Sequence, residues 1–392
     1  MSNTQKKNVP ELRFPGFEGE WEEKKLESII KVNSGKDYKH LDKGDIPVYG
    51  TGGYMTSVSE PLSEIDAVGI GRKGTINKPY LLEAPFWTVD TLFYCTPKKE
   101  TDILFILSLF RKINWKVYDE STGVPSLSKQ TINKINRFVP TNKEQQKIGK
   151  FFSKLDRQIE LEEQKLELLQ QQKKGYMQKI FSQELRFKDE NGNDYPEWEN
   201  VMLQKVLKDK TEGIKRGPFG GALKKDIFVE SGYAVYEQRN AIYDISNFRY
   251  YINENKYKEM QSFSVQPNDI IMSCSGTIGR LALIPQNYTK GIINQALIRF
   301  RTNHKIRSEF FLIFMRSNQM QRKILEANPG SAITNLVPVK ELKLIPFPLP
   351  VKFEQDKISQ FILIINRRIE QSEKKIESLK NRKQGFLQKL FV

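Results

Sequence analysis

The strongest constraint on the fold is a segment that occurs twice in the chain. Residues 140–181 and 350–391 align without a gap at a constant offset of 210 residues. Both copies share a Glu-Gln dipeptide near the start, at Glu144–Gln145 and Glu354–Gln355. A gapless match of this length indicates an internal repeat.

Each copy has the periodicity of a long helix with one apolar seam. Alternating spacings of three and four residues are typical of a coiled coil. The predicted seam consists of Phe152, Leu155, Ile159, Leu166, Leu169, Tyr176, Ile362, Ile365, Ile369, Ile376, Leu379 and Phe386. It is polar at Glu162/Ser372 and at Lys173/Lys383, and Thr141 with Glu144 suggests a capping box. Two identical stripes most simply bury each other, although two helices on separate cores would share the pattern.

The repeat unit is larger than the helix. An ELRF arm that leads to a tryptophan stands at Glu11–Trp21 and again at Glu184–Trp198. The bodies between arm and helix contain short strand-like pieces broken by glycine and proline, with helices expected near Asp102–Ile113 and Glu309–Glu326. The expected parts are an arm at 1–21, a body at 22–140, a helix at 141–182, a second arm at 183–200, a second body at 201–350 and a helix at 351–392. The fold class expected is α+β: two mixed α/β domains joined by an antiparallel helix pair with a pseudo-two-fold.

Charge and composition limit the partner and the compartment. The formal net charge is +16, which favours a polyanionic partner, and nucleic acid is the first expectation. No apolar run is long enough to cross a bilayer, and the first residues do not resemble a signal peptide. Two cysteines and two histidines, placed apart, predict a cytoplasmic chain without disulfides or a zinc site.

Motifs of catalysis are weak. Gly69–Gly74 matches GxGxxG, but no helix is expected after it, so a tight turn with Arg72 and Lys73 at its tip is the better interpretation. The sequence contains no GxxxxGK[ST] loop, no Asn/Asp-Pro-Pro-aromatic tetrapeptide and no paired-carboxylate nuclease motif. We expect no catalytic residue in this chain.

Basic and aromatic loops with glycine are the candidate site. Glycine lets a backbone approach phosphate, and arginine, glutamine and asparagine can read base edges. The candidate DNA-binding residues are Lys36, Tyr38, Lys39, Tyr49, Thr51, Tyr54, Arg72, Lys73, Lys215, Arg216, Phe219, Lys224, Lys225, Gln238, Arg239, Asn240 and Arg280.

These strings together resemble the specificity (S) subunit of Type I restriction–modification systems. The resemblance rests on the repeated helix, on PVYGTGGY and GIGRKGTI in the first body, and on RGPFGGALKK and SCSGTIG in the second. It implies two target recognition domains, each reading one half of a split site on double-stranded DNA. It also implies a helix pair that spaces them and docks two methyltransferase subunits, through which restriction/translocase subunits join. S-adenosylmethionine would then belong to the methyltransferase, and this chain would bind no cofactor.

Two other functions stay open at the level of sequence. A self-contained nuclease or methyltransferase with unrecognised motifs would carry its own chemistry. An RNA-binding coiled-coil protein would also be basic. The first body's Arg72–Lys73 pair has no basic match in the second body's Ser273–Gly276, so the two domains are not expected to use that turn alike.

Overall fold

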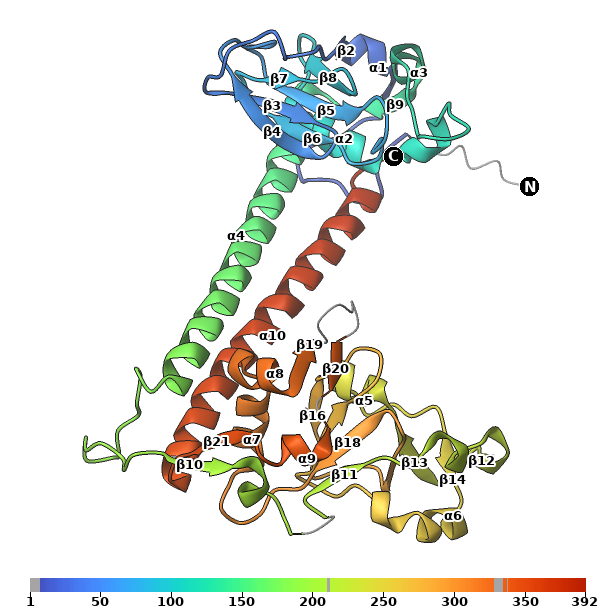
Figure 1. Ribbon diagram of the computed structural model, residues 1–392. Helices are drawn as coiled ribbons and strands as arrows, with labels where there is room; N and C mark the ends of the chain where they lie inside the picture. Colours follow the sequence, from blue (N-terminus) through green and yellow to red (C-terminus); the bar gives the residue numbers. More distant parts are fainter. Residues whose placement is uncertain (1–7, 210–211, 328–333, 337) are drawn as a thin grey trace. The chain divides into compact units, whose positions relative to one another are not determined.

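The computed structural model describes residues 8–209, 212–327, 334–336 and 338–392. The chain forms two compact units, one of residues 1–166 with 371–392 and the other of residues 167–370. Two long helices, α4 (Asn142–Phe181) and α10 (Lys352–Lys389), contribute to both units (Figure 1). The predicted pair of long helices is therefore confirmed.

The predicted seam is the packed face of these helices. Phe152, Leu155, Ile159, Ile362, Ile365, Ile376 and Leu379 are buried, and Leu166, Leu169, Ile369 and Phe386 are half-buried. In the first unit, Phe151 meets Phe386 at 5.0 Å between ring centroids, and Glu162 forms an ion pair with Lys375. The helices therefore run antiparallel there. Glu162 and Ser372, the equivalent polar residues of the two seams, also meet, because Ser372 Oγ donates to Glu162 Oε2 at 3.3 Å.

Tyr176 departs from the expected seam. Its side chain is 38% exposed and lies at the edge, with its ring 5.0 Å from that of Phe361. This pair is the repeat of Phe151–Phe386 in the second unit, at the same centroid distance. The aromatic contact at the edge of the seam thus joins a seam residue of one helix, Phe386 or Tyr176, to the neighbour of a seam residue on the other, Phe151 or Phe361.

The first body contains two small sheets. One is antiparallel, in the order β2 (Ile30–Ser34), β8 (Leu92–Pro97), β5 (Ala67–Gly71) and β6 (Tyr80–Leu82). The other has the order β4 (Gly53–Val58), β3 (Ile46–Gly50) and β7 (Trp87–Thr88), in which β3 and β7 are parallel. The remaining elements are β1 (Glu22–Lys25), which pairs with β9 (Asn136–Val139), and the helices α1 (Leu26–Ile29), α2 (Ile103–Lys112), the 3-10 turn Trp115–Tyr118 and α3 (Lys129–Lys134).

The second body repeats this topology. Its antiparallel sheet has the order β11 (Ile214–Arg216), β18 (Leu297–Phe300), β15 (Ile270–Ser273) and β16 (Leu281–Leu283). Its second sheet has the order β12 (Phe228–Val229), β14 (Tyr251–Ile252), β13 (Tyr233–Tyr236) and β17 (Gly291–Ile293), again with one parallel pair, β13 and β17. The other elements are β10 (Glu199–Met202) with β21 (Pro346–Leu349), β19 (Leu325–Ala327) with β20 (Thr334–Leu336), and α5 (Gln238–Tyr243), α6 (Glu254–Glu259), α7 (Ser308–Met315), α8 (Asn318–Ile324) and α9 (Val339–Leu342).

One expected helix is two helices. The segment Glu309–Glu326 forms α7 and α8, with Arg316 and Ser317 between them. Ser317 is the N-cap of α8, and its hydroxyl accepts from Met320 N at 3.2 Å. A serine at this position satisfies an amide of the new first turn, which favours a break over a continuous helix.

The shared Glu-Gln dipeptide attaches arm and body to the long helix. In the first unit, Arg13 of the arm donates to both oxygens of Glu144 at 2.8 Å. Gln145 Oε1 accepts from the amide of Asp102, which caps α2, at 3.0 Å. The partner of the Glu144 carboxylate is therefore Arg13 of the arm. The capping box expected from Thr141 and Glu144 assigned this carboxylate to the wrong partner.

The second unit has the same attachment. Arg186 donates to Glu354 Oε1 at 2.8 Å and Oε2 at 3.0 Å, and Gln355 Oε1 accepts from the amide of Arg307, the N-cap of α7, at 2.7 Å. Trp198 Nε1 adds a bond to Glu354 at 2.8 Å. The corresponding nitrogen of Trp21 in the first unit finds no acceptor among the described residues.

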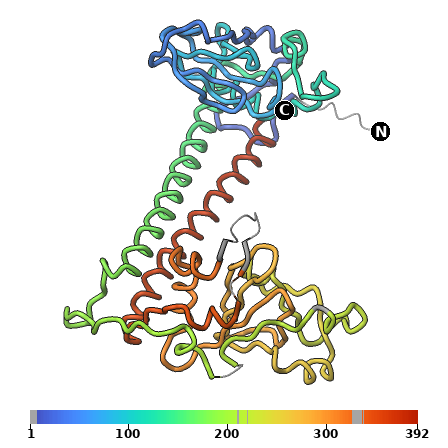
Figure 2. Tube along the Cα trace, in the orientation of Figure 1, coloured from blue at the N-terminus to red at the C-terminus, as the bar shows by residue number. Residues whose placement is uncertain are grey.

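Each arm also bonds to the end of a long helix. Leu185 N donates to Lys179 O of α4 at 3.0 Å, while Leu12 N donates to Lys389 O of α10 at 2.9 Å. The first arm and the last helix are the two ends of the chain, and they lie together in the first unit (Figure 2). In the second unit the arm follows the helix α4 directly along the chain. In the first unit the arm and the end of α10 are joined only by non-covalent contacts.

Removal of the buried carboxylate tests this attachment. Glu354→Gln leaves Arg186 without its ion pair, and we expect the free energy of unfolding of the second unit to fall by about 3 kcal/mol. Chemical denaturation measures the loss, and hydrogen exchange assigns it to the unit. The control is Glu254→Gln, whose pair with Lys258 is exposed on both sides, and for which we expect no measurable change in the free energy of unfolding. Equal effects of the two changes would contradict the attachment.

Candidate nucleic-acid interface

In the first unit, two predicted basic residues stand where β5 ends. Arg72 N donates to Thr91 O at 2.8 Å, and the guanidinium lies 5.9 Å from the centroid of the Phe93 ring. Both Arg72 and Lys73 are exposed, and Gly74 follows with a positive φ of 87°. The next element is β6 and not a helix, so the GxGxxG match is a turn, as expected from the sequence.

The tip of the β3–β4 hairpin lies beside this turn. A Cβ added to Gly74 would be 4.0 Å from Thr51 Oγ1. Tyr54 is 63% exposed, and its ring lies 6.4 Å from that of the half-buried Tyr49. The half-buried Thr51 therefore lies beside the turn that carries the exposed Arg72 and Lys73, and the exposed Tyr54 follows Thr51 on the same hairpin.

The predicted segment after β2 is partly structural. Lys36 N donates to Thr88 O at 2.8 Å, and its carbonyl accepts from Trp87 Nε1 at 2.9 Å, while its side chain is exposed. Lys39 is exposed as well. Tyr38 instead packs against the buried cluster that contains Trp87, so its ring serves mainly the core.

A pocket of about 360 Å³ adds residues that the sequence did not suggest. It is lined by Ser34, Phe93, Arg72, Lys73 and Lys129, among others. Lys129 opens α3 directly after its N-cap Ser128, whose hydroxyl accepts from Thr131 N at 3.0 Å. The cap could have predicted the helix, but only the fold brings Lys129 next to Arg72.

In the second unit, the group forms around the turn after β15. Ser275 Oγ donates to Gln238 Oε1 at 3.5 Å, and a Cβ added to Gly276 would lie 3.3 Å from the same oxygen. Arg216 stands at the end of β11, close to the Cys274 thiol, whose pKa burial raises and the nearby guanidinium lowers in part. The thiol itself donates to Gln295 O at 3.6 Å. Arg280 is exposed at the end of the same turn.

The remaining predicted residues of this unit divide by exposure. Phe219 is 93% exposed, and Lys224 and Lys225 are exposed. Lys215 is half-buried, with its amine 4.6 Å from the centroid of the Phe263 ring, and Arg239 is half-buried on α5.

Asn240 differs from the other predicted residues. Its side chain is 2% exposed, and its amide donates to Ile245 O at 2.8 Å and Asn247 O at 3.1 Å. Its oxygen accepts from Glu237 N at 2.8 Å and closes the capping box of α5. These bonds use the side chain within the unit, so we leave Asn240 out of the candidate interface.

The register of the sheets shows which residues correspond. Arg72 N bonds to Thr91 O and Cys274 N to Ala296 O, each at 2.8 Å, so Arg72 corresponds to the buried Cys274. Gly35 N bonds to Leu92 O and Gly217 N to Leu297 O. The residues before these glycines, Ser34 and Arg216, therefore correspond too.

The arginine thus comes from different strands in the two units. Arg72 follows β5 and shares a pocket with Ser34, while Arg216 ends β11 and lies close to Cys274. The basic pair Arg72–Lys73 is indeed absent from the second body's turn, but the neighbouring strand supplies a guanidinium beside it. An arginine at this place can meet a phosphate or the edge of a guanine.

Two absences apply to the described part of the chain. No group of three or more histidine, cysteine, aspartate and glutamate side chains there could hold a metal ion. None of the helices described is both long and apolar enough to span a bilayer.

The fold defines a class of protein in which two mixed α/β units of one topology share a pair of long helices. The chain matches the family model of the Type I restriction modification DNA specificity domain at residues 18–171 and again at 219–381. It belongs to this family and is a specificity subunit of a Type I restriction–modification system, the non-catalytic subunit that determines DNA specificity.

Known proteins agree with this assignment. The chain is 24% identical over 349 residues to the Type I restriction enzyme MjaVIII specificity subunit of Methanocaldococcus jannaschii, covering 84% of this chain and 76% of that protein. The crystal structure of the S subunit from M. genitalium superposes with a TM-score of 0.64 at 15% identity over 98% of this chain and 99% of that chain. A chain from a study of complex assembly and conformational transition of the type I system gives 0.55 at 14% identity, covering 94% and 97%.

The corresponding glycines before the site give a stability test. A Cβ on Gly217 would lie 1.8 Å from Asn294 O, and one on Gly35 would lie 2.0 Å from Val89 O. Because backbone must move in both cases, we expect Gly217→Ala and Gly35→Ala each to lower the free energy of unfolding by about 1–3 kcal/mol. Denaturant titration checks this. Gly52→Ala meets no atom within 4 Å and serves as the control. Unchanged stability of both variants would refute the proposed correspondence of these close approaches.

Proposed function

We propose that residues 22–140 and 201–350 are two target recognition domains that each read one half of an asymmetric, bipartite site on double-stranded DNA. The observation that carries this proposal is that an arginine, Arg72 or Arg216, stands beside the corresponding turn of each body, although the two come from different strands. A formal net charge of +16 supports a polyanionic partner. The different surroundings of the two arginines support different half-sites.

The proposed contacts include the exposed and half-exposed residues of the two groups. Lysines would attract the phosphate backbone, while arginine and glutamine would meet base edges. In the first domain these are Lys36, Lys39, Thr51, Tyr54, Arg72, Lys73 and Lys129. In the second they are Lys215, Arg216, Phe219, Lys224, Lys225, Gln238, Arg239 and Arg280.

We further propose that α4 and α10 fix the unread gap between the half-sites and dock two methyltransferase subunits. Restriction/translocase subunits would join through the methyltransferase. S-adenosylmethionine would be held by the methyltransferase, and the assembly would act in the cytoplasm. The family match supports these partners, and so does the internal repeat, because two related surfaces can receive two copies of one protein.

Methylation mapping tests the function as a whole. The chain is expressed with a cognate methyltransferase subunit, and the modified bases in cellular DNA are mapped. We expect N6-methyladenine at a single split, asymmetric motif, and none without this chain. Assembly of the complex without a methylated motif would refute the proposal, and S-adenosylmethionine binding by the chain alone would favour a self-contained enzyme.

Substitution of the two arginines tests the assignment of the domains. We expect Arg72→Ala and Arg216→Ala each to weaken binding of the mapped site by about 1–3 kcal/mol if the side chain meets a base, with specificity relaxed in one half-site only. A phosphate contact would instead lower the slope of log K against log salt by about 0.9, without a change in the motif. Titration of duplex DNA at several salt concentrations separates the two. Lys31→Ala, an exposed charge on β2, is the control. Relaxation of the same half-site by both arginine changes would contradict the division of labour.

A further inference from the structure

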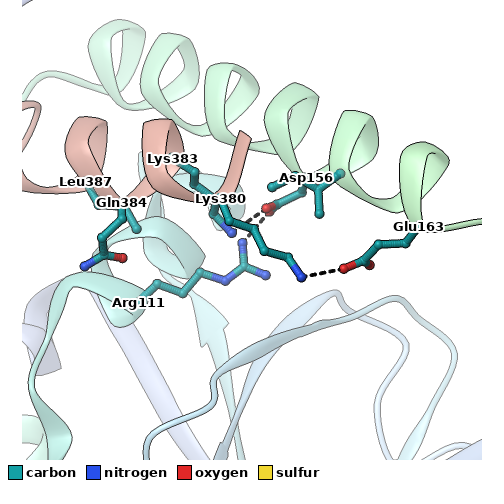
Figure 3. A pocket seen from close by; sticks show the side chains of 8 residues that line it. Arg111, Asp156, Glu163, Lys380, Lys383, Gln384 and Leu387 are labelled. Atoms are coloured by element: carbon teal, nitrogen blue, oxygen red, sulfur yellow. Dashed lines mark hydrogen bonds and ion pairs between the residues drawn. The ribbon is translucent and has the colours of Figure 1, made fainter. Parts of the chain in front are cut away.

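Each unit has a pocket where the long helices meet a helix of the body. In the first unit the pocket has a volume of about 410 Å³, and each of its cations pairs with a carboxylate of the pocket itself (Figure 3). Asp156 of α4 forms ion pairs with both Arg111 of α2 and Lys383 of α10. A second carboxylate, Glu163, pairs with Lys380 at 2.6 Å.

The second unit contains the same pocket, built from the corresponding residues. The repeat offset of 210 relates Lys383 to Lys173 and Asp156 to Asn366. Arg316 corresponds to Arg111. Arg111 stands nine residues after Asp102, whose amide donates to Gln145, and Arg316 stands nine residues after Arg307, whose amide donates to Gln355. This pocket is larger, at about 870 Å³, and Lys173, Arg316 and Asn366 all line it.

The two pockets differ in one decisive group, since Asn366 is an amide where Asp156 is a carboxylate. No carboxylate among the residues that the structure describes forms an ion pair with Lys173, and burial together with Arg316 lowers the pKa of its amine. Arg316 turns to Leu281 O at 2.5 Å and to Asp244 at 3.3 Å. Lys174, Arg322 and Lys323 also line the pocket, while none of its lining residues is acidic. A half-buried ammonium without a counter-charge favours the approach of an anion.

The walls of this pocket favour a protein as the source of the anion. Met177, Phe181, Ile313, Ile362 and Ile369 form an apolar lining beside Lys173. A DNA phosphate would gain nothing from these side chains, whereas an aliphatic or aromatic residue would bury surface against them. The volume lies within the range of about 300–1,000 Å³ that is typical of pockets that enclose a ligand.

We propose that the pocket of the second unit receives, from a partner protein, the carboxylate that the first unit supplies through Asp156. The occupant is an acidic segment with an aspartate or glutamate beside an apolar residue. This inference rests on the proposed function, because the methyltransferase subunit is the protein that the helix pair would dock. The two subunits then bind by different contacts, and only the one on the second unit inserts an acidic segment.

Substitutions in the two pockets of the full-length chain test the proposal. Asn366→Asp gives the second pocket its own carboxylate, and Lys173→Met removes the cation. We expect either change to weaken the binding of one methyltransferase subunit by about tenfold and to leave the other unchanged. Native mass spectrometry of the titrated complex gives both affinities. Asp156→Asn, in the first unit, should leave the affinity of the subunit on the second unit unchanged.

Controls separate the pocket from general charge and from folding. Gln360→Glu adds the same charge at an exposed position of α10 outside the pocket and should not affect binding. We expect Asn366→Asp to melt at or above the temperature of the unaltered chain, because Lys173 gains a counter-charge, whereas Asp156→Asn should melt lower.

Two results would overturn the proposal while the proposed function stands. One is assembly of Asn366→Asp and Lys173→Met with unaltered affinity for both subunits. The other is that these variants lose affinity for duplex DNA in the absence of the methyltransferase, which would identify the anion as a phosphate. If the unaltered chain binds no methyltransferase subunit, the proposed function fails, and the partner assigned here fails with it.

Discussion

Two neighbouring buried side chains, a glutamate and a glutamine, hold each unit together. Glu354 accepts two bonds from Arg186 of the arm, and Gln355 accepts from the cap of α7. Because an unpaired buried carboxylate or amide is costly, arm, body and helix must all be present before both residues are satisfied. The first unit meets the same requirement although its arm and its α10 segment come from opposite ends of the chain. The repeat is therefore best understood as one attachment used twice.

The sequence predicts much of this fold because its main signals are local. Heptad spacing identifies both long helices, and an apolar helical pattern identifies the helix near Asp102–Ile113, which is α2 (Ile103–Lys112). The break at Ser317 was missed, because an apolar helix pattern continues across it. The partner of Glu144 was also missed: a capping box is a local explanation, whereas Arg13 is brought there by tertiary structure. Residue pairs that are distant in sequence leave no periodic trace.

The candidate site stays a prediction, and the structure shows which of its residues lie together. Basic loops with glycine marked the turns that carry the exposed cations, and Thr51 lies beside Gly74 in the turn that carries Arg72. Asn240 could not be told from a surface amide until its three bonds inside the second unit were seen. Lys129 was missed because nothing in its neighbourhood in sequence marks it. Direct comparison of the two turns suggested that the second had lost its basic group, whereas strand register shows that Arg216 stands beside the same place.

Two differences between the repeats, the strand that supplies the arginine and the exchange of Asp156 for Asn366, follow one physical rule. Where aromatic rings pack between the helices, the copies keep the same contacts, as in the pairs Phe151–Phe386 and Phe361–Tyr176, because the rings of both copies fill the same space. The copies differ instead where another residue or a partner can supply the polar group. The guanidinium comes from Arg72 after β5 in one copy and from Arg216 on β11 in the other, and the carboxylate of Asp156 is replaced by the amide of Asn366. A duplicated scaffold can thus keep its frame while its two ends acquire different ligands. The packed seam is the part in which such a difference would cost the most, since a change there must suit both helices at once.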